Sequence, residues 1–257
     1  MSVVQGALKG CGLELRRIAK EQAATDVAID VLSLCVADLV TRQKEPFFVQ
    51  IGAHDGVSFD PIRPFVEKFR WRGLLVEPQP KVFKKLVENY RGHPQLILEN
   101  AAVAERDGTA TLYSFEDSPG IPEHASMLAS FRRESLEANG HGYSGPIKSL
   151  TVPALSFSTL LQKHGVARVD ILQIDTEGFD YEILKMIDFA KVRPALIHFE
   201  NNFLTAAEMT DCNRMLAGHG YRLLTLGIDS LAYQQAANEH FGERAQASGL
   251  DAGARRL

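Results

Sequence analysis

The chain has 257 residues, 45% of them hydrophobic and 23% charged, and its formal net charge at pH 7 is −4. This length and composition are typical of a globular domain that buries a sizeable core. The slightly acidic balance argues against nucleic acid as a partner, because nucleic-acid binding requires a basic surface.

The N-terminal region has the composition of neither a signal peptide nor a membrane span. Charged residues interrupt its apolar stretches at Lys9, Glu14, Arg16, Arg17, Asp30 and Asp38, whereas a signal core or a spanning helix is continuously apolar. The three cysteines, Cys11, Cys35 and Cys212, show no C-x-x-C spacing. We therefore expect a cytoplasmic protein with reduced thiols and no membrane partner.

Residues 1–44 are expected to form a helical extension that precedes a larger domain at 45–257. Val27, Val31, Cys35 and Leu39 recur every four residues and would form one apolar stripe along a helix. Such a stripe packs most often on the core of its own domain, and a lid or a dimer surface is the alternative.

From residue 47 onward, predicted strands and helices alternate. Strands are expected at 47–51, 73–77, 95–99, 109–115, 169–174 and 194–199, and helices at 61–70, 80–91, 156–163, 179–187 and 205–217. Repeated strand–helix units form a doubly wound, mostly parallel sheet with helices on both faces. Extended runs at 221–226 and 231–235, joined by a turn at 227–230, predict a C-terminal antiparallel hairpin. The predicted fold class is therefore α/β.

The first predicted strand runs into a glycine loop, F-F-V-Q-I-G-A-H-D-G at 47–56. Gly52 and Gly56 allow the backbone to turn sharply and to approach a ligand closely. The second strand ends in Glu77, 25 residues after Gly52. That spacing is typical of a carboxylate that binds the ribose hydroxyls of a nucleoside cofactor in a Rossmann-type fold.

The loop favours S-adenosylmethionine (SAM) over NAD as this cofactor. A dinucleotide-binding loop has a glycine where this chain has His54, and its N–H groups face a pyrophosphate. The charge of Asp55 would repel a pyrophosphate, whereas SAM has no phosphate and carries an ammonium and a sulfonium. An NAD-linked oxidoreductase is therefore the weaker alternative.

Residues 116–149 are rich in glycine and proline, and they predict a long irregular insertion with one short helix near 129–138. Insertions of this kind are usually functional or disordered, and this one is expected to close over a substrate. His124 could act as a base, and Arg132 and Arg133 could bind an anionic group. The simpler interpretation of all three is a solvated surface.

Five segments, in this order along the chain, resemble the FkbM family of SAM-dependent methyltransferases. The most specific is V-D-I-L-Q-I-D-T-E-G-F-D at 169–180, which is similar to the family motif lKiDvEG-E. The others are V-Q-I-G-A-H-D-G at 49–56, V-E-P at 76–78, N-A-A-V at 100–103 and the strand at 194–200, which ends in glutamate. The resemblance covers roughly residues 46–205.

The chain departs from the family pattern at three positions. His54 stands where asparagine is common, Gln173 where lysine is common, and Asp180 where glutamate is common. These departures leave the expected cofactor site intact and bear on the choice of substrate.

The resemblance implies a class I methyltransferase fold of the Rossmann-like type, SAM as the cofactor, and O-methylation of a hydroxyl on a small molecule, sugar or glycan. The loop at 50–56 would border the methionine end of SAM, Glu77 the ribose, and Asn100 and Ala101 the adenine. The expected cofactor-binding residues are Gln50, Gly52, Ala53, His54, Asp55, Gly56, Glu77, Pro78, Asn100, Ala101 and Asp175.

Asp175 is expected to act in the reaction, because it ends an apolar strand at the edge where α/β sheets bind ligands. His54 and His198 are the candidate general bases, although His198 could also be a satisfied histidine of the core. Glu177 and Asp180 are explained equally well as the start of a helix.

Transfer of a methyl group from SAM to a hydroxyl is the function that this pattern favours. One alternative uses Mg²⁺ held by Asp175, Glu200 and Asn201, but we expect no metal. Another is a SAM-binding accessory protein without transferase activity. The sequence leaves open which acceptor is methylated and whether the chain forms a homo-oligomer.

Overall fold

The computed structural model describes residues 30–42, 45–116, 118–138 and 142–234. The strands of its larger sheet are β1 (Phe47–Ile51), β2 (Arg72–Val76), β3 (Leu96–Glu99), β8 (Ile171–Ile174), β9 (Leu196–Glu200), β10 (Tyr221–Leu226) and β11 (Asp229–Gln234). The helices around it are α2 (Val31–Arg42), α3 (Arg63–Phe69), α4 (Pro80–Asn89), α7 (Phe157–Lys163), α8 (Asp180–Met186) and α9 (Ala206–Gly218). The predicted elements of this layer are confirmed, and from residue 47 onward their ends agree within two residues.

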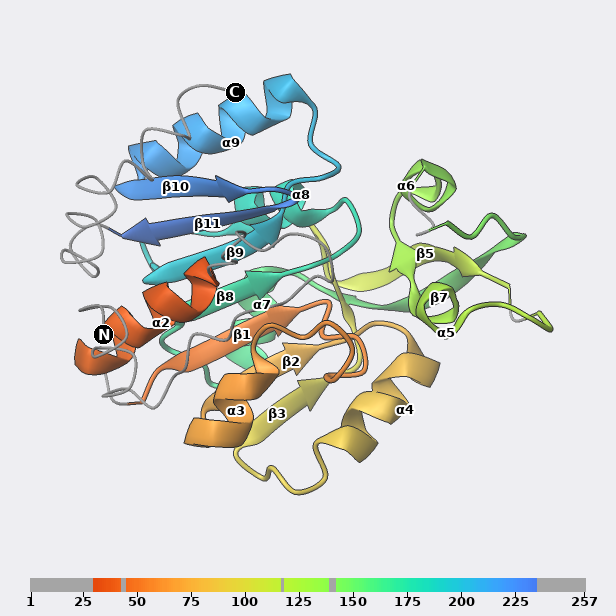
Figure 1. Cartoon of the computed structure of the whole chain (residues 1–257), viewed down its shortest axis with the longest axis horizontal. Coiled ribbons are helices and arrows are strands. Elements are labelled where there is room, and N and C mark those ends of the chain that lie inside the picture. Colours follow the sequence, from red (N-terminus) through yellow and green to blue (C-terminus); the bar gives the residue numbers. More distant parts are fainter. Residues whose placement is uncertain (1–29, 43–44, 117, 139–141, 235–257) are drawn as a thin grey trace, which may run out of the picture.

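The seven strands lie in the order β10-β11-β9-β8-β1-β2-β3 (Figure 1). Neighbouring strands are parallel except at β11, which runs antiparallel to both β9 and β10. This is the doubly wound α/β sheet with a C-terminal antiparallel hairpin that the sequence predicts, and it is of the class I methyltransferase type. The chain winds outward in both directions from the β1–β8 pair, which makes the carboxyl ends of these strands the expected ligand site.

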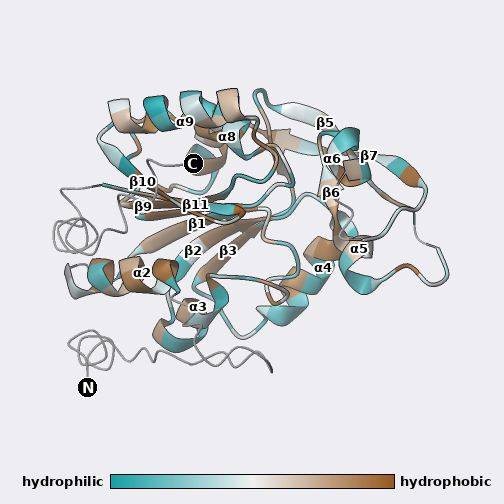
Figure 2. Ribbon diagram, turned by 45° about the horizontal axis from the view of Figure 1, so that its top comes forward, coloured by the Kyte–Doolittle hydropathy of each residue, from teal (hydrophilic) through white to brown (hydrophobic). Residues whose placement is uncertain are grey.

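Alternate residues of the strands face opposite sides of the large sheet and form two separate cores. One core joins Phe48 and Ile171 to apolar residues of α2, α3 and α4. The other joins Val49 and Leu172 to apolar residues of α7, α8 and α9. Figure 2 shows α2 and α3 on one side of the strands and α8 and α9 on the other. A parallel sheet covered on both faces explains why its strands are almost continuously apolar.

Helix α2 packs its predicted stripe on the first of these cores. Val31, Cys35 and Leu39 are buried there, whereas Val27 lies outside the described residues. With 12 residues, α2 is shorter than the roughly 20 residues that a membrane-spanning helix needs. In the part of the chain that the structure describes, no helix is both long and apolar enough to cross a bilayer.

A second, smaller sheet corrects the prediction for the middle of the chain. Its strands are β4 (Ala102–Val103), β5 (Gly108–Phe115), β6 (Ala129–Ser130) and β7 (Ile147–Leu155), and it carries α5 (Glu123–Met127) and α6 (Arg133–Ala138). The strand order is β4-β7-β5-β6. The short helix predicted near 129–138 is present as α6, but the segment 116–149 also carries α5, β6 and the start of β7, so it is less irregular than predicted. Pro153 and several polar residues obscure β7 in the sequence, although it pairs with β5 along almost its whole length.

Hydrogen bonds attach the smaller sheet to the carboxyl edge of the larger one. The side-chain amide of Gln79 donates to the backbone carbonyl of Met127 in α5. The hydroxyl of Ser130 donates to the backbone carbonyl of Glu177 at 2.7 Å. The two sheets therefore enclose a space at the edge where α/β proteins bind ligands.

Gly52 is required by the close approach of β1 and β8 at this edge. Its φ is +80°, and a Cβ atom there would lie 1.7 Å from the carbonyl oxygen of Asp175. We expect Gly52→Ala to lower the free energy of unfolding by about 2–4 kcal/mol, through backbone strain and overlap. Chemical denaturation would measure the loss.

Gly165→Ala is the matched control for this variant. Gly165 has a φ of +63°, and no atom of the described structure lies within 4 Å of the place that a Cβ atom would take. Only the conformational cost of about 1 kcal/mol is therefore expected. Equal losses in the two variants would contradict the close approach at Gly52.

Candidate functional site

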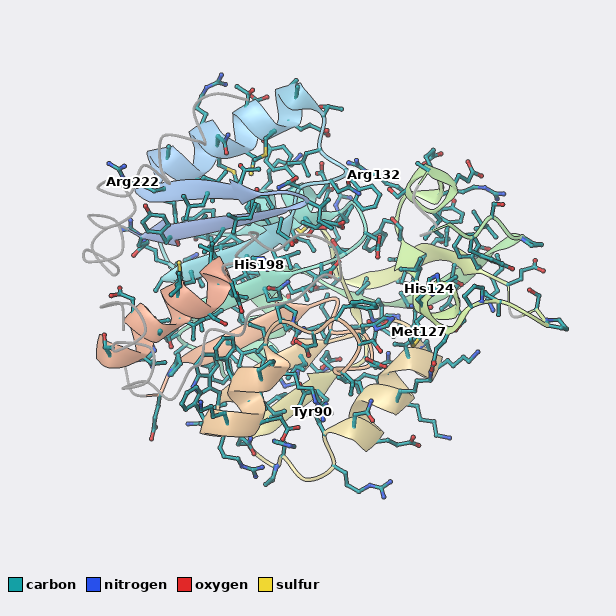
Figure 3. The ribbon with its side chains drawn as sticks, in the orientation of Figure 1. Tyr90, His124, Met127, Arg132, His198 and Arg222 are labelled. Atoms are coloured by element: carbon teal, nitrogen blue, oxygen red, sulfur yellow. The ribbon has the colours of Figure 1, made fainter. Side chains whose placement is uncertain are left out.

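A cavity of about 790 Å³ lies between the carboxyl edge of the large sheet and the smaller sheet. Its lining comes from β1, β2, β8, β9 and the β10–β11 turn on one side, and from β4, β5, α5 and residues 128–131 on the other. Figure 3 labels His198 on β9, and His124 and Met127 on α5. The volume falls within the range of roughly 300–1,000 Å³ that is usual for small-molecule sites.

The floor of the cavity follows from the alternation of side chains along β1, β8 and β9. One face of these strands begins with three core residues in register, Phe48, Ile171 and Leu196. Two residues further along, the same face carries Gln50, Gln173 and His198. Two residues further again, it carries Gly52, Asp175 and Glu200. The apolar core therefore changes to a polar surface at the strand ends, and the cavity begins there.

Gln173 and His198 form a buried hydrogen-bonded pair, with 2.6 Å between Gln173 Oε1 and His198 Nδ1. An amide oxygen can only accept, so Nδ1 of His198 carries the proton in this arrangement. Burial lowers the pKa of His198, which keeps the imidazole neutral near pH 7. Nε2 is then left as a proton acceptor, as a general base requires.

Glu77 follows β2, lines the cavity and is only 4% exposed. One carboxylate oxygen accepts the N–H of His54 at 3.0 Å, and the other accepts the N–H of Gln79 at 2.8 Å. His54 has a φ of +53°, which is uncommon outside glycine. Burial raises the pKa of Glu77 to about 7, and the two N–H donors act against that increase. The carboxylate is thus held in a fixed position.

The predicted loop residues divide into two groups. Gln50, Gly52, Ala53 and His54 line the cavity. Asp55 does not, because its carboxylate accepts the N–H groups of Val57 and Ser58 at 2.9 and 2.7 Å. The carbonyl of Gly56 is likewise turned to the guanidinium of Arg63 at 2.8 Å. Asp55 and Gly56 therefore shape the loop that carries the cavity-lining residues.

The predicted adenine-binding residues divide in the same way. Pro78 and Ala101 line the cavity. The Asn100 amide instead donates to the backbone carbonyls of Glu77 and Pro78 at 2.7 and 3.1 Å, so it braces the chain after β2. Beside Ala101 the wall is apolar and consists of Ala102, Val103 and Leu112.

Four acidic side chains line the opposite end of the cavity: Asp175, Glu177, Glu200 and Asp229. Burial, followed by the charge of Asp175, raises the pKa of Glu200 to about 9. Burial and the charge of Asp180 raise the pKa of Glu177 to about 7. Asp175 is open to the cavity, yet lost hydration and the charges of Asp180 and Glu177 raise its pKa well above the usual range. Neighbouring negative charges therefore oppose the ionisation of Asp175, Glu177 and Glu200.

Asp180, which begins α8, supports this acidic end from behind. Its Oδ2 accepts the N–H and the hydroxyl of Thr176 at 3.2 and 2.7 Å, and its Oδ1 accepts the N–H of Glu200 at 3.1 Å. Among the described residues, no side chain caps the N-terminus of α8. The role of Asp180 is thus to tie the loop after β8 to the end of β9.

The cavity as a whole favours positive ligands. Its acidic lining residues are Asp60, Glu77, Glu123, Asp175, Glu177, Glu200 and Asp229, and among the described residues that line it there is no lysine or arginine. Arg132 and Arg133, the candidates for binding an anion, do not line it and pair with Glu182 and Glu137. A pyrophosphate would be repelled here, so the case against NAD rests on the cavity and not on Asp55 alone.

The arrangement offers no support for the Mg²⁺ alternative. Among the described residues, no group of three or more His, Cys, Asp or Glu side chains is placed to hold a metal ion. The amide of Asn201, the third ligand of that alternative, donates to the hydroxyl of Ser230 at 2.9 Å.

Several cavity residues were not predicted from the sequence. Asp60 accepts a hydrogen bond from Gln50 at 3.2 Å, and burial raises its pKa. Phe59 also lines the cavity, although the residue is 93% exposed, and its backbone φ is +56°. Asp229 could have been found, because the predicted hairpin ends at the same sheet edge. The cavity residues of the smaller sheet could not be found in this way, because no sequence pattern predicted that this sheet lies at the same edge.

A family model described as the methyltransferase FkbM domain matches residues 50–223. The chain therefore belongs to the FkbM methyltransferase family, as the five sequence segments indicate. A relative of known sequence, methyltransferase sdnD of Sordaria araneosa, is 26% identical over 169 residues. That match covers 59% of this chain and 64% of the relative, so the chain spans less than two thirds of that protein's length.

Two solved structures to which the chain is similar are described as methyltransferases. An FkbM methyltransferase from Methylobacillus flagellatus KT has a TM-score of 0.46 and 10% identity, over 80% of this chain and 55% of that one. A precorrin-6y C5,15-methyltransferase from Geobacter metallireducens GS-15 has a TM-score of 0.41 and 13% identity, over 85% of this chain and 94% of that one.

The raised pKa of Glu200 makes stability depend on pH. A carboxyl whose folded pKa lies above its unfolded value stabilises fully below the unfolded pKa and loses that contribution as pH rises through the folded pKa. For Glu200 the window runs from the ordinary glutamate pKa of 4.5 to about 9. The Tm of Glu200→Gln relative to wild type should therefore increase from pH 5 to pH 9.

Thermal unfolding across this pH range would measure the difference. Glu88→Gln, at an exposed position on α4, is the control and should show no comparable increase. A Tm difference for Glu200→Gln that stays constant with pH would argue against the buried, unpaired carboxylate.

Proposed function

We propose that this protein transfers a methyl group from SAM to a hydroxyl group of a small molecule, a sugar or a glycan. The observation that carries the proposal is the fixed carboxylate of Glu77 at one end of an otherwise acidic cavity without basic lining residues in the described chain. A nucleoside ribose matches that carboxylate, and a cofactor with positive charge and no phosphate matches the remainder.

The residues present fit SAM along its length. Glu77 would accept the ribose hydroxyls, with its orientation already set by the N–H groups of His54 and Gln79. Ala101 and the apolar wall beside it would contact the adenine. The methionine end would lie along the turn at Gly52, where Asp175 offers a carboxylate to the ammonium.

SAM supplies an electrophilic methyl carbon on its sulfonium. The protein's part is to hold the acceptor oxygen in line with that carbon and to remove the hydroxyl proton. His198 is the favoured base, because its bond to Gln173 fixes the ring and leaves Nε2 as the acceptor. His54 is the second candidate, since burial lowers its pKa as well.

The assignment of Glu77 is tested by S-adenosylhomocysteine (SAH) binding. Glu77→Gln keeps the side-chain shape and removes the charge, and it should weaken SAH binding by about 1.5–3 kcal/mol, the range for hydrogen bonds to a charged group. Isothermal titration calorimetry would measure the affinity, with Glu88→Gln as the control and NAD as a ligand that should not bind. Unchanged SAH affinity in Glu77→Gln would remove Glu77 from the ribose.

The metal-free mechanism is tested by titrating the protein with MgCl₂ and by adding EDTA to the transfer reaction. We expect no saturable Mg²⁺ binding and no loss of turnover, because the described residues place no metal-binding group at Asp175 and Glu200. Saturable binding that is lost in Asp175→Asn, together with inhibition by EDTA, would instead establish a metal-dependent enzyme.

A further inference from the structure

Glu200 lines the cavity, and one oxygen atom of its carboxyl group has no hydrogen-bond partner among the described residues. The residue is 9% exposed, and the unpaired atom, Oε2, is buried. Buried polar groups in native proteins nearly always have a partner, because burying one without a hydrogen bond is costly. A carboxylate retained in this state points to a ligand that supplies the missing donor.

Glu200 has acidic neighbours on each side that also line the cavity. Asp229 lies opposite Glu200 in the β9–β11 pair. Asp175 comes directly after β8, the other neighbour of β9, and lies beside Glu200 at the ends of these strands. Glu177 comes from the loop after β8, where its φ is +53°. None of the described residues that line the cavity is a lysine or an arginine, so no basic side chain of this lining lies among these acids.

SAM does not account for all of these acids. Glu77 follows β2, and Glu200 ends β9, three strand positions away in the sheet. Neighbouring strands lie about 4.8 Å apart, so these two carboxylates are separated by roughly 14 Å across the strands. With Glu77 at the ribose and Asp175 at the methionine ammonium, Glu177, Glu200 and Asp229 remain beyond the cofactor, on the side where the acceptor must enter.

We propose that Glu200, Asp229 and Glu177 bind a protonated amine of the methyl acceptor, so that the acceptor is a hydroxyl-bearing amine such as an amino sugar or an amino alcohol. This inference rests on the proposed function. An ammonium has three donors and tolerates varied geometry, whereas a metal ion needs converging ligands that the described residues do not provide. An acceptor carrying a phosphate or a carboxylate in this position would be repelled.

Matched pairs of amines and neutral analogues test the proposal. The probes are glucosamine with glucose, ethanolamine with ethylene glycol, and cyclohexylamine with cyclohexanol, titrated at pH 7 into the full chain with and without SAH. At least one amine should bind about tenfold more tightly than its neutral analogue, the factor expected for a hydrogen bond to a charged group. Ligand-observed NMR would measure the affinities.

Variants assign the effect to this end of the cavity. Glu200→Gln and Asp229→Asn should each remove most of the preference for the amine while leaving SAH affinity within about twofold. Glu182→Gln is the control, because Glu182 lies on α8, pairs with Lys185 and does not line the cavity. It should keep the preference.

The outcomes separate this inference from the proposed function. If SAH binds but no amine is preferred over its neutral analogue, or if the preference survives both variants, the amine subsite is wrong and the methyltransferase assignment stands. If SAH does not bind, the proposed cofactor is wrong, and the titrations without SAH still decide the amine subsite by the same criterion.

Discussion

Carboxyl groups that face one another across a poorly hydrated cavity repel when they ionise, and the site is organised around that repulsion. Burial and neighbouring charges raise the pKa of Asp175, Glu177 and Glu200 together. The same strands compensate on their other face, where β1, β8 and β9 pack an entirely apolar layer against α7, α8 and α9. The electrostatic cost of the acidic cluster is therefore offset by a tightly packed apolar core directly behind it.

The carboxylates at the two ends of the cavity differ in their hydrogen bonds, and this difference is the basis for proposing a cofactor at one end and an acceptor at the other. Glu77 already accepts two backbone N–H groups, so its orientation is set before any ligand arrives. Such a group suits neutral hydroxyl donors whose position must be reproducible. Glu200 keeps a buried oxygen that no donor of the described chain reaches, so it gains most from a ligand that brings charge as well as hydrogen bonds.

The sequence predicts the large sheet well because strong local signals repeat along it, whereas the smaller sheet depends on pairing between distant residues. Apolar strands separated by helices predict the parallel direction of β1, β2, β3, β8 and β9, and the ends of β1, β2 and β8 locate Gly52, Glu77 and Asp175. No local sequence pattern indicates that β7 pairs with β5, because Pro153 lies within β7 and proline is uncommon inside a strand. Nor does a motif show side-chain direction: Asp55 and Asn100 match the family segments, yet Asp55 bonds within its own loop and Asn100 bonds to the chain after β2. Glu200 and Asp229 meet only because β11 lies beside β9.

The residue at position 173 decides how negative the centre of the cavity remains. Gln173 stands in register between Gln50 and His198, one row below Asp175, where the family pattern commonly has lysine. A lysine in that row would place an ammonium beneath the acids and neutralise part of their charge. Glutamine instead accepts a hydrogen bond from Nδ1–H of His198 and adds no charge, so the cavity contains a neutral histidine in a fixed orientation and an acidic end with no basic residue in its described lining. Gln173 contributes to both properties, which are the basis for proposing an acceptor that brings its own positive charge.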